Sequence, residues 1–192
     1  MPNDTIMLNK EIGPLQDAQQ AIKIVRERAK EWNIDTNKVG VAGFSAGGHL
    51  ASTLATHSTN EVIDNKEHTN LRPDFQVLLW PVISMADSLM HKGSRDKLLG
   101  ESPSIKMIRE YSTELRVNAQ TPPAFIAHAG DDKAVTVTNS ILYYQALQKN
   151  NVIAELHIYP KGGNGFGLIN PTTPDRWLDR CRNWMISNSW LK

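Results

Sequence analysis

Apolar and polar positions follow a helical period in the first patterned segment of the chain, which begins at Pro14. Apolar side chains return at steps of three and four residues, and most residues between them are Gln, Lys, Arg or Glu. This pattern, with a proline at the first helical position, predicts an amphipathic helix. Its apolar positions are Leu15, Ala18, Ile22, Val25, Ala29 and Trp32.

Four later segments are nearly continuous apolar runs of strand length. Such runs are typical of parallel strands that are buried on both faces. Helical patterns separate or follow these runs, and this alternation predicts an α/β fold whose parallel sheet is covered on both faces. The predicted strands are residues 39–44, 74–83, 123–130 and 154–160, and the predicted helices are residues 46–57, 140–151 and 174–191.

Length and composition indicate one domain. The chain has 192 residues, of which 40% are hydrophobic and 21% are charged, and this balance is typical of a soluble globular protein with a sizeable core. No internal repeat or low-complexity tract divides it, so we expect a single domain over residues 1–192. Residues 84–120 are the one candidate for a small helical insertion.

Charge and cysteine content limit the classes of partner and the compartment that we expect for this chain. The net charge of +1 is spread along the chain without a basic block, so we expect neither nucleic acid nor an anionic membrane as a partner. Cys181 is the only cysteine, which excludes an internal disulfide; it leaves the redox compartment open and mildly favours the cytoplasm for the chain as given. The first residues form no signal-peptide core, and no run of 18 apolar residues occurs.

The densest candidate chemistry lies in "GFSAG", where Ser45 stands between a predicted strand and a predicted helix. This matches G-x-S-x-G in the context that the motif requires. The serine would occupy a strained turn with positive φ, and the N–H of Ala46 at the helix start would favour negative charge. We therefore interpret Ser45 as a nucleophile; the alternative is a glycine-rich turn with an incidental serine.

A serine nucleophile needs a base, and the base needs an orienting carboxylate. The segment "HAGDDKAV" follows the third predicted strand, and the active sites of parallel sheets gather at the carboxyl ends of strands. We choose Asp131 as this acid, with Asp132 as the alternative. Either could instead be a turn residue that caps the helix beginning near Val137.

Four segments together resemble the alpha/beta-hydrolase fold, in particular its acetyl xylan esterase-like carbohydrate-esterase branch, often labelled xylanase. They are "GFSAGGHLA", "RPDFQVLLWPVIS", "TPPAFIAHAGDDKAV" and "ELHIYPKGGNGFGL". The resemblance covers nearly the whole chain and implies a three-layer sandwich. It also implies Ser45 as nucleophile, Asp131 as acid, Ala46 as an oxyanion donor, and hydrolysis of a small-molecule or oligosaccharide ester, such as acetylated xylan, without a cofactor.

Asn164 departs from that family pattern. In such families the last strand is followed by G-G-H-G-F, whose histidine is the general base, whereas this chain has "GGNGF". An amide does not titrate near neutral pH, so Asn164 could hold a hydrogen bond but could not shuttle a proton. We interpret His49 and His128 as structural residues rather than substitute bases. The remaining histidines show no ligand spacing, and we expect no metal site.

Length is a second departure. Such hydrolases usually place about four strands before the nucleophile strand, including a loop that supplies a second oxyanion N–H, whereas this chain starts roughly one helix before it. We therefore expect residues 39–44 to form a strand with one free edge. Two interpretations follow: the chain self-associates along that edge, or it is a fragment of a longer protein.

Three hypotheses about function remain. The first is a carbohydrate-type serine carboxylesterase in a truncated or disabled form. The second is a non-catalytic binding protein that keeps the hydrolase pocket. The third treats "KGGNGFG" as a phosphate-binding loop, although its spacing matches neither G-x-G-x-x-G nor the P-loop.

Overall fold

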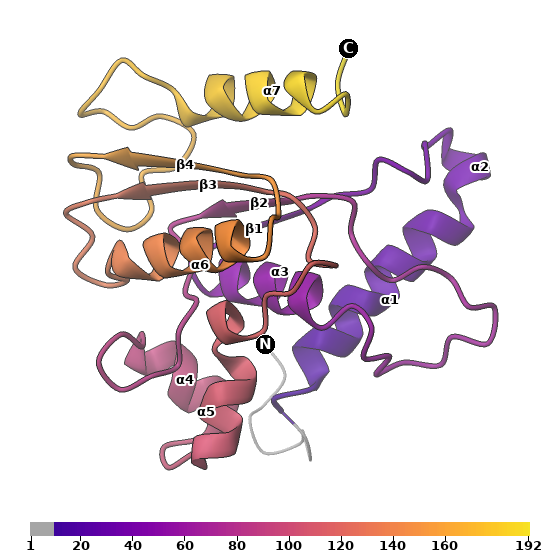
Figure 1. Ribbon diagram of the computed structural model, residues 1–192, viewed down its shortest axis with the longest axis horizontal. Coiled ribbons are helices and arrows are strands. Elements are labelled where there is room, and N and C mark those ends of the chain that lie inside the picture. The colour runs from indigo at the N-terminus through magenta and orange to yellow at the C-terminus, as the bar shows by residue number, and fades with distance from the viewer. Residues whose placement is uncertain (1–9) are drawn as a thin grey trace.

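The computed structural model describes residues 10–192 and contains a four-stranded sheet with helices on both faces (Figure 1). All neighbouring strands are parallel, in the order β1-β2-β3-β4. The predicted α/β class is confirmed. The strands are β1 (Val41–Phe44), β2 (Gln76–Leu79), β3 (Ala124–Ala129) and β4 (Ala154–Tyr159), each within a predicted apolar run.

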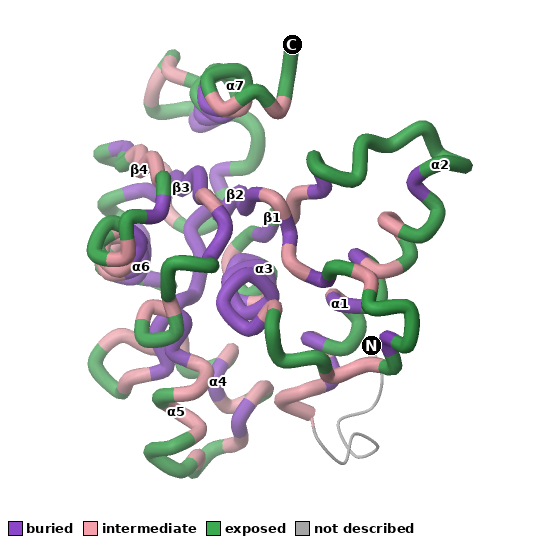
Figure 2. Tube along the Cα trace, turned by 45° about the vertical axis from the view of Figure 1, so that its right-hand side comes forward, coloured by how far each residue is buried: buried purple, intermediate pink, exposed green. Residues whose placement is uncertain are grey.

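The helices divide between the two faces of the sheet. In Figure 1, α7 (Trp177–Ser187) covers one face, and α3 (Ala46–Thr56) and α6 (Thr138–Lys149) cover the other. Figure 2 shows α3 as the most continuously buried helix, in keeping with its small and apolar residues. The three helices correspond to predicted segments, and the layered arrangement agrees with the predicted sandwich.

The core has a separate cluster on each face. On the α7 side, Phe125 from β3 packs with Trp184 of α7. On the α6 side, Ile126 from β3 packs in one cluster with Tyr143 of α6. Because successive strand residues point to opposite faces, the unbroken apolar run in β3 supplies both clusters.

The first predicted helix is observed as two segments, α1 (Gly13–Glu27) and α2 (Ala29–Trp32). The helix is interrupted at Arg28, whose φ of −95° and ψ of 9° lie outside the helical region. Trp32, the last apolar position of the predicted helix, is 41% exposed rather than buried. The Arg28 guanidinium lies over its ring instead, 4.8 Å from the centroid.

Between β2 and β3, the chain forms α4 (Lys92–Leu99), α5 (Ile105–Tyr111) and the short 3₁₀ helix η1 (Thr113–Leu115). These elements lie below α3 and α6 in Figure 1. A small cluster containing Val82, Met85 and Leu99 packs here. That residues 84–120 form an inserted unit stays a prediction.

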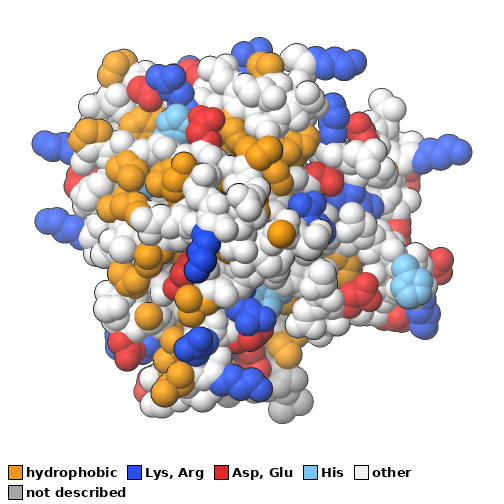
Figure 3. Space-filling view, in the orientation of Figure 1, with side chains coloured by type: hydrophobic (Ala, Val, Ile, Leu, Met, Phe, Trp, Pro, Cys, Tyr) orange, Lys and Arg blue, Asp and Glu red, His pale blue; other side chains and the backbone are white. Residues whose placement is uncertain are grey.

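β1 and β4 are the two edge strands of the described sheet. β1 pairs only with β2 within residues 10–192, so its other side is free, as expected from the sequence. Charged side chains of both signs are scattered over the face shown in Figure 3. Among the helices of the described residues, none has the length and apolar character needed to cross a membrane.

Candidate active site

Ser45 lies in the turn between β1 and α3, at the carboxyl end of β1. Its φ of 50° and ψ of −119° are the strained conformation expected from the motif. Such a residue costs about 1–3 kcal/mol and persists only where its surroundings hold it. Main-chain bonds hold it here: the Ser45 N–H donates to the Leu79 oxygen at 3.0 Å, and the Ser45 oxygen accepts from Val82 N–H at 3.0 Å.

Glycines permit the close crossing of strand and helix around Ser45. A Cβ on Gly43 would collide with the main chain of Gly47. A Cβ on Gly48 would lie 2.6 Å from the Pro81 side chain. Gly43 of the motif and the following Gly48 therefore have a steric reason, whereas Gly47 has open space around its missing side chain.

The first turn of α3 presents two free amides beside Ser45. The amides of Gly48 and His49 donate to the Ser45 oxygen at 3.0 and 3.2 Å. Those of Ala46 and Gly47 have no acceptor within residues 10–192. Free N–H groups at the start of an 11-residue helix favour negative charge at this point.

Asp132 follows β3 and accepts four hydrogen bonds. Its Oδ1 accepts from the amides of Ala134 and Val135, both at 2.9 Å. Its Oδ2 accepts from Asn164 Nδ2 at 2.8 Å and from His128 Nε2 at 3.1 Å. Asp132 is 6% exposed, so its carboxylate is buried. Its partners come from β3, from the turn after β3 and from the loop after β4.

Asp131 lies one residue earlier and has different surroundings. It is exposed, and its Oδ1 accepts from the main-chain amide of Gly163 at 2.8 Å. The structure thus brings both aspartates against the glycine-rich loop that follows β4. The side chain of Asn164 meets Asp132 and not Asp131.

The loop after β4 brings Asn164 toward β3 by means of its glycines. Positive φ angles occur at Gly163 and Gly165, on either side of Asn164, with values of 62° and 91°. Phe166 anchors the loop: it is 8% exposed, and the centroid of its ring lies 4.3 Å from that of Trp80. Within the described residues, no hydrogen bond joins Asn164 to the hydroxyl of Ser45.

His128 and His49 are both held in the interior, as expected. The Nε2 of His128 also lies 2.9 Å from the Val135 oxygen and must donate to it, and Nδ1 lies 2.7 Å from Ser140 Oγ. Burial lowers the pKa of His128. His49 donates from Nε2 to the Tyr111 oxygen at 2.8 Å, and burial lowers its pKa to about 4.

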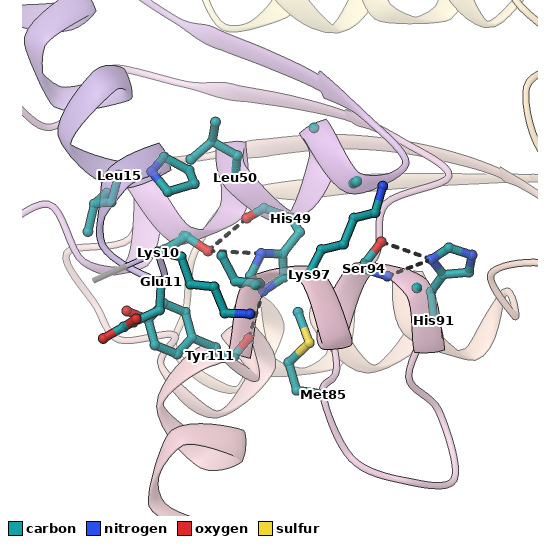
Figure 4. Close-up of a pocket in the computed structure, with 16 residues that line it drawn as sticks. Lys10, Glu11, Leu15, His49, Leu50, Met85, His91, Ser94, Lys97 and Tyr111 are labelled. Carbon is teal, nitrogen blue, oxygen red and sulfur yellow. Dashed lines mark hydrogen bonds between the residues drawn. The ribbon is translucent and has the colours of Figure 1, made fainter. Parts of the chain in front are cut away.

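A cavity of about 620 Å³ opens beside the first turn of α3 (Figure 4). Its walls come from α3, α4, the end of α5 and the start of α1, and they are mostly apolar. Ala46 and Gly47 form one wall, with Leu50, Met85 and Leu98 among the apolar residues around them. Volume and lining are typical of a site for a small ligand.

The sequence did not show which aspartate binds the side chain of Asn164 and which binds the main chain of the loop. An aspartate that accepts from amides two and three residues later forms a local turn, and "DKAV" carries that signal for Asp132. The contact between Asp132 and Asn164 spans 32 positions of sequence and has no local signal.

A parallel sheet, a strained serine between strand and helix, and an acid after a later strand define an α/β hydrolase. The chain belongs to the BD-FAE family, whose model matches residues 10–147. That match includes Ser45 and both aspartates and ends before Asn164.

Individual relatives agree with this family. The chain is 45% identical over 179 residues to an acetylxylan esterase of Xylanibacter ruminicola, covering 91% of this chain and 35% of that protein. The crystal structure of an acetyl ester-xyloside bifunctional hydrolase from Caldicellulosiruptor lactoaceticus is 43% identical, with a TM-score of 0.87 over 93% of this chain and 66% of the other. A sugar hydrolase of Lactococcus lactis is 30% identical, with a TM-score of 0.76 over 97% and 72%. The chain thus spans about a third of the acetylxylan esterase.

Proposed function

We propose that this chain carries the nucleophile and the acid of a serine ester hydrolase that acts on acetylated, xylan-type carbohydrates. The observation that carries the proposal is Ser45 at a φ of 50°, with the free amides of Ala46 and Gly47 beside it. The acetylxylan esterase and the acetyl ester-xyloside hydrolase described above support the substrate class. The proposal includes no cofactor.

Each group has a role in ester cleavage. The Ser45 hydroxyl oxygen attacks the ester carbonyl carbon, and the hydroxyl proton must pass to a base as the new bond forms. The Ala46 N–H donates to the oxyanion that develops on the carbonyl oxygen. The alcohol then leaves with the proton, and the acetyl group stays on the Ser45 oxygen. Water next attacks this acetyl ester, a base accepts the proton of the water, and acetate is released.

We assign the acid to Asp132 in place of our first choice, Asp131. Asp132 is buried and faces the side chain at position 164, the position of the family's histidine. Asp131 is exposed and accepts from the main-chain amide of Gly163, a contact that involves no side chain of the loop. A carboxylate that orients a base must face the side chain of that base, as Asp132 faces position 164.

Asn164 occupies the position of the base and cannot perform its function. Its Nδ2 donates to Asp132 at 2.8 Å, as an imidazole N–H would in a complete triad. An amide cannot accept the serine proton near neutral pH, and loss of the histidine in a serine hydrolase costs on the order of a million-fold in turnover. We therefore expect this chain to bind an ester and to hydrolyse it little or not at all.

A non-catalytic binding protein is the second candidate. The same asparagine favours it, together with the cavity beside Ala46, which needs no base in order to hold a ligand. Turnover that depends on Ser45 would distinguish the two candidates, because only the hydrolase requires that hydroxyl.

Calorimetry with acetylated and deacetylated xylo-oligosaccharides tests the substrate class. We expect the acetylated ligand to bind more tightly, and we expect Gly47→Leu to abolish binding, because that side chain would project into open space at the cavity wall. Gly47→Ala is the matched control and should bind nearly normally. Equal affinity for both ligands, or no binding at all, would contradict the proposed substrate.

A further inference from the structure

β4 has a free outer edge. The main-chain oxygens of Ile153 and Tyr159 accept from Ala124, the first residue of β3, and from Gly130, just after β3, at 3.0 and 2.7 Å. Hydrogen-bonding groups alternate along a strand, so the odd-numbered residues of β4 face β3 and the even-numbered ones face outward. Ala154, Leu156 and Ile158 therefore present their N–H and C=O groups to the outer side, where no strand pairs within residues 10–192.

The edge lacks the features that usually prevent pairing. β4 is six residues long, contains no lysine or proline, and pairs with β3 in continuous register. Ile158 and the preceding Ile153 are 46% and 59% exposed. Hydrophobic side chains also gather over β4 and α6 in the left part of Figure 3. Such an edge is a template for another strand.

We infer that β4 pairs antiparallel with β4 of a second copy of this chain, about a twofold axis at Leu156. In a symmetric antiparallel pair, the central residue lies opposite its own equivalent; here an even-numbered centre exchanges both main-chain bonds with that equivalent, and an odd-numbered centre exchanges none. An odd-numbered centre would place Glu155 opposite Glu155 or His157 opposite His157, so an even-numbered centre is favoured. Leu156 is the middle one, so this register has the longest overlap, and Ala154 of one copy lies opposite Ile158 of the other.

The side chains fit this register on both faces of the sheet. On the α6 side, Leu156 meets its equivalent and Ile158 meets Ala154, so apolar groups meet apolar groups. On the α7 side, Glu155 lies opposite His157 of the second copy, and this pair occurs twice. The two side chains are 43% and 24% exposed and already contact each other at 2.6 Å within one copy.

Other pairings lack this complementarity. A centre at Ala154 or Ile158 leaves Glu155 facing no histidine and shortens the overlap. The opposite edge of the sheet, β1, offers four residues without a charged side chain. Charge and register together therefore select the pairing about Leu156.

Cysteine crosslinking tests the register in the full chain. A disulfide needs Cα atoms roughly 4–7 Å apart. Leu156→Cys meets this condition across the twofold axis. In Ile158→Cys, the Cα atoms of the two cysteines would lie about 14 Å apart. Mild oxidation should crosslink the first variant and not the second, with the unmodified chain as background because Cys181 is buried. Equal crosslinking of both variants, or a monomer at all concentrations, would overturn the inference.

Sedimentation velocity tests the charges. His157→Glu places carboxylates opposite each other in both pairs, and we expect it to weaken the dimer about tenfold. Adding Glu155→His to that variant restores opposite partners and should restore most of the affinity. Circular dichroism checks that both variants fold. An unchanged dissociation constant in His157→Glu, or no recovery in the double variant, would show that another surface mediates any association.

Discussion

Asp132 and Asp131 offer a matched pair for testing the geometry of the site, because each can be changed to asparagine. Asp132→Asn replaces one acceptor oxygen with an NH₂ group. The Oδ1 bonds to the Ala134 and Val135 amides can persist, but the NH₂ then faces two donors, from Asn164 and His128.

The expected cost follows from those two lost bonds. A hydrogen bond to a charged group contributes about 1.5–3 kcal/mol, and a buried donor left unpaired costs about 1–3 kcal/mol. We expect Asp132→Asn to lower the free energy of unfolding by about 3 kcal/mol, which corresponds to a fall of about 10 °C in Tm for a chain of this size. Asp131→Asn should change it by less than about 1 kcal/mol, because Asp131 is exposed and its single oxygen contact can be kept.

Urea unfolding followed by tryptophan fluorescence measures both variants against the unmodified chain. Equal losses of unfolding free energy in the two variants, or a larger loss in Asp131→Asn, would refute the assignment of the buried hydrogen bonds to Asp132. The choice of Asp132 as the acid depends on that assignment. A changed slope of the transition would signal an altered denatured state rather than a lost contact.

Three further changes follow from the same site. Gly48→Ala should destabilise the chain by about 1–3 kcal/mol in urea unfolding because its methyl group has no room; Gly47→Ala, which has room, should not, and equal losses would contradict the steric account. The pKa of His49 is lowered to about 4, so the unfolded chain binds more protons below about pH 6.5, and stability should fall by up to about 3 kcal/mol as the pH drops from 7 to 4. Unfolding of His49→Gln across that range should show a flatter dependence; an unchanged slope would contradict the assignment. In Asn164→His, an imidazole next to the Asp132 carboxylate should have a raised pKa in an NMR titration. Adding Asp132→Asn should abolish that rise; persistence would show that the imidazole points elsewhere.

Most of the fold could be predicted because its signals are local. Continuous apolar runs gave the four parallel strands, and G-x-S-x-G gave the positive φ of Ser45. The break at Arg28 had no such signal, since the apolar spacing continues through it to Trp32. The helix ends there through backbone angles that the hydrophobic pattern does not encode.

The partners of the two aspartates could not be predicted from sequence. Asp131 and Asp132 are chemically identical neighbours, and the direction of each side chain depends on the turn after β3. The choice between them depends on where Asn164 lies, and that depends on the loop conformation set by Gly163 and Gly165. Sequence indicated that Asn164 stands at the position of the family's histidine, but only three-dimensional structure gives its contact with Asp132.

We propose that this site has a nucleophile in Ser45 and an acid in Asp132 but no base. Hydrolysis of p-nitrophenyl acetate, measured for the unmodified chain and for Ser45→Ala at equal concentration, tests it most directly. We expect equal and low rates for the two proteins, because Asn164 cannot accept the serine proton. Robust turnover by the unmodified chain that is lost in Ser45→Ala would contradict it.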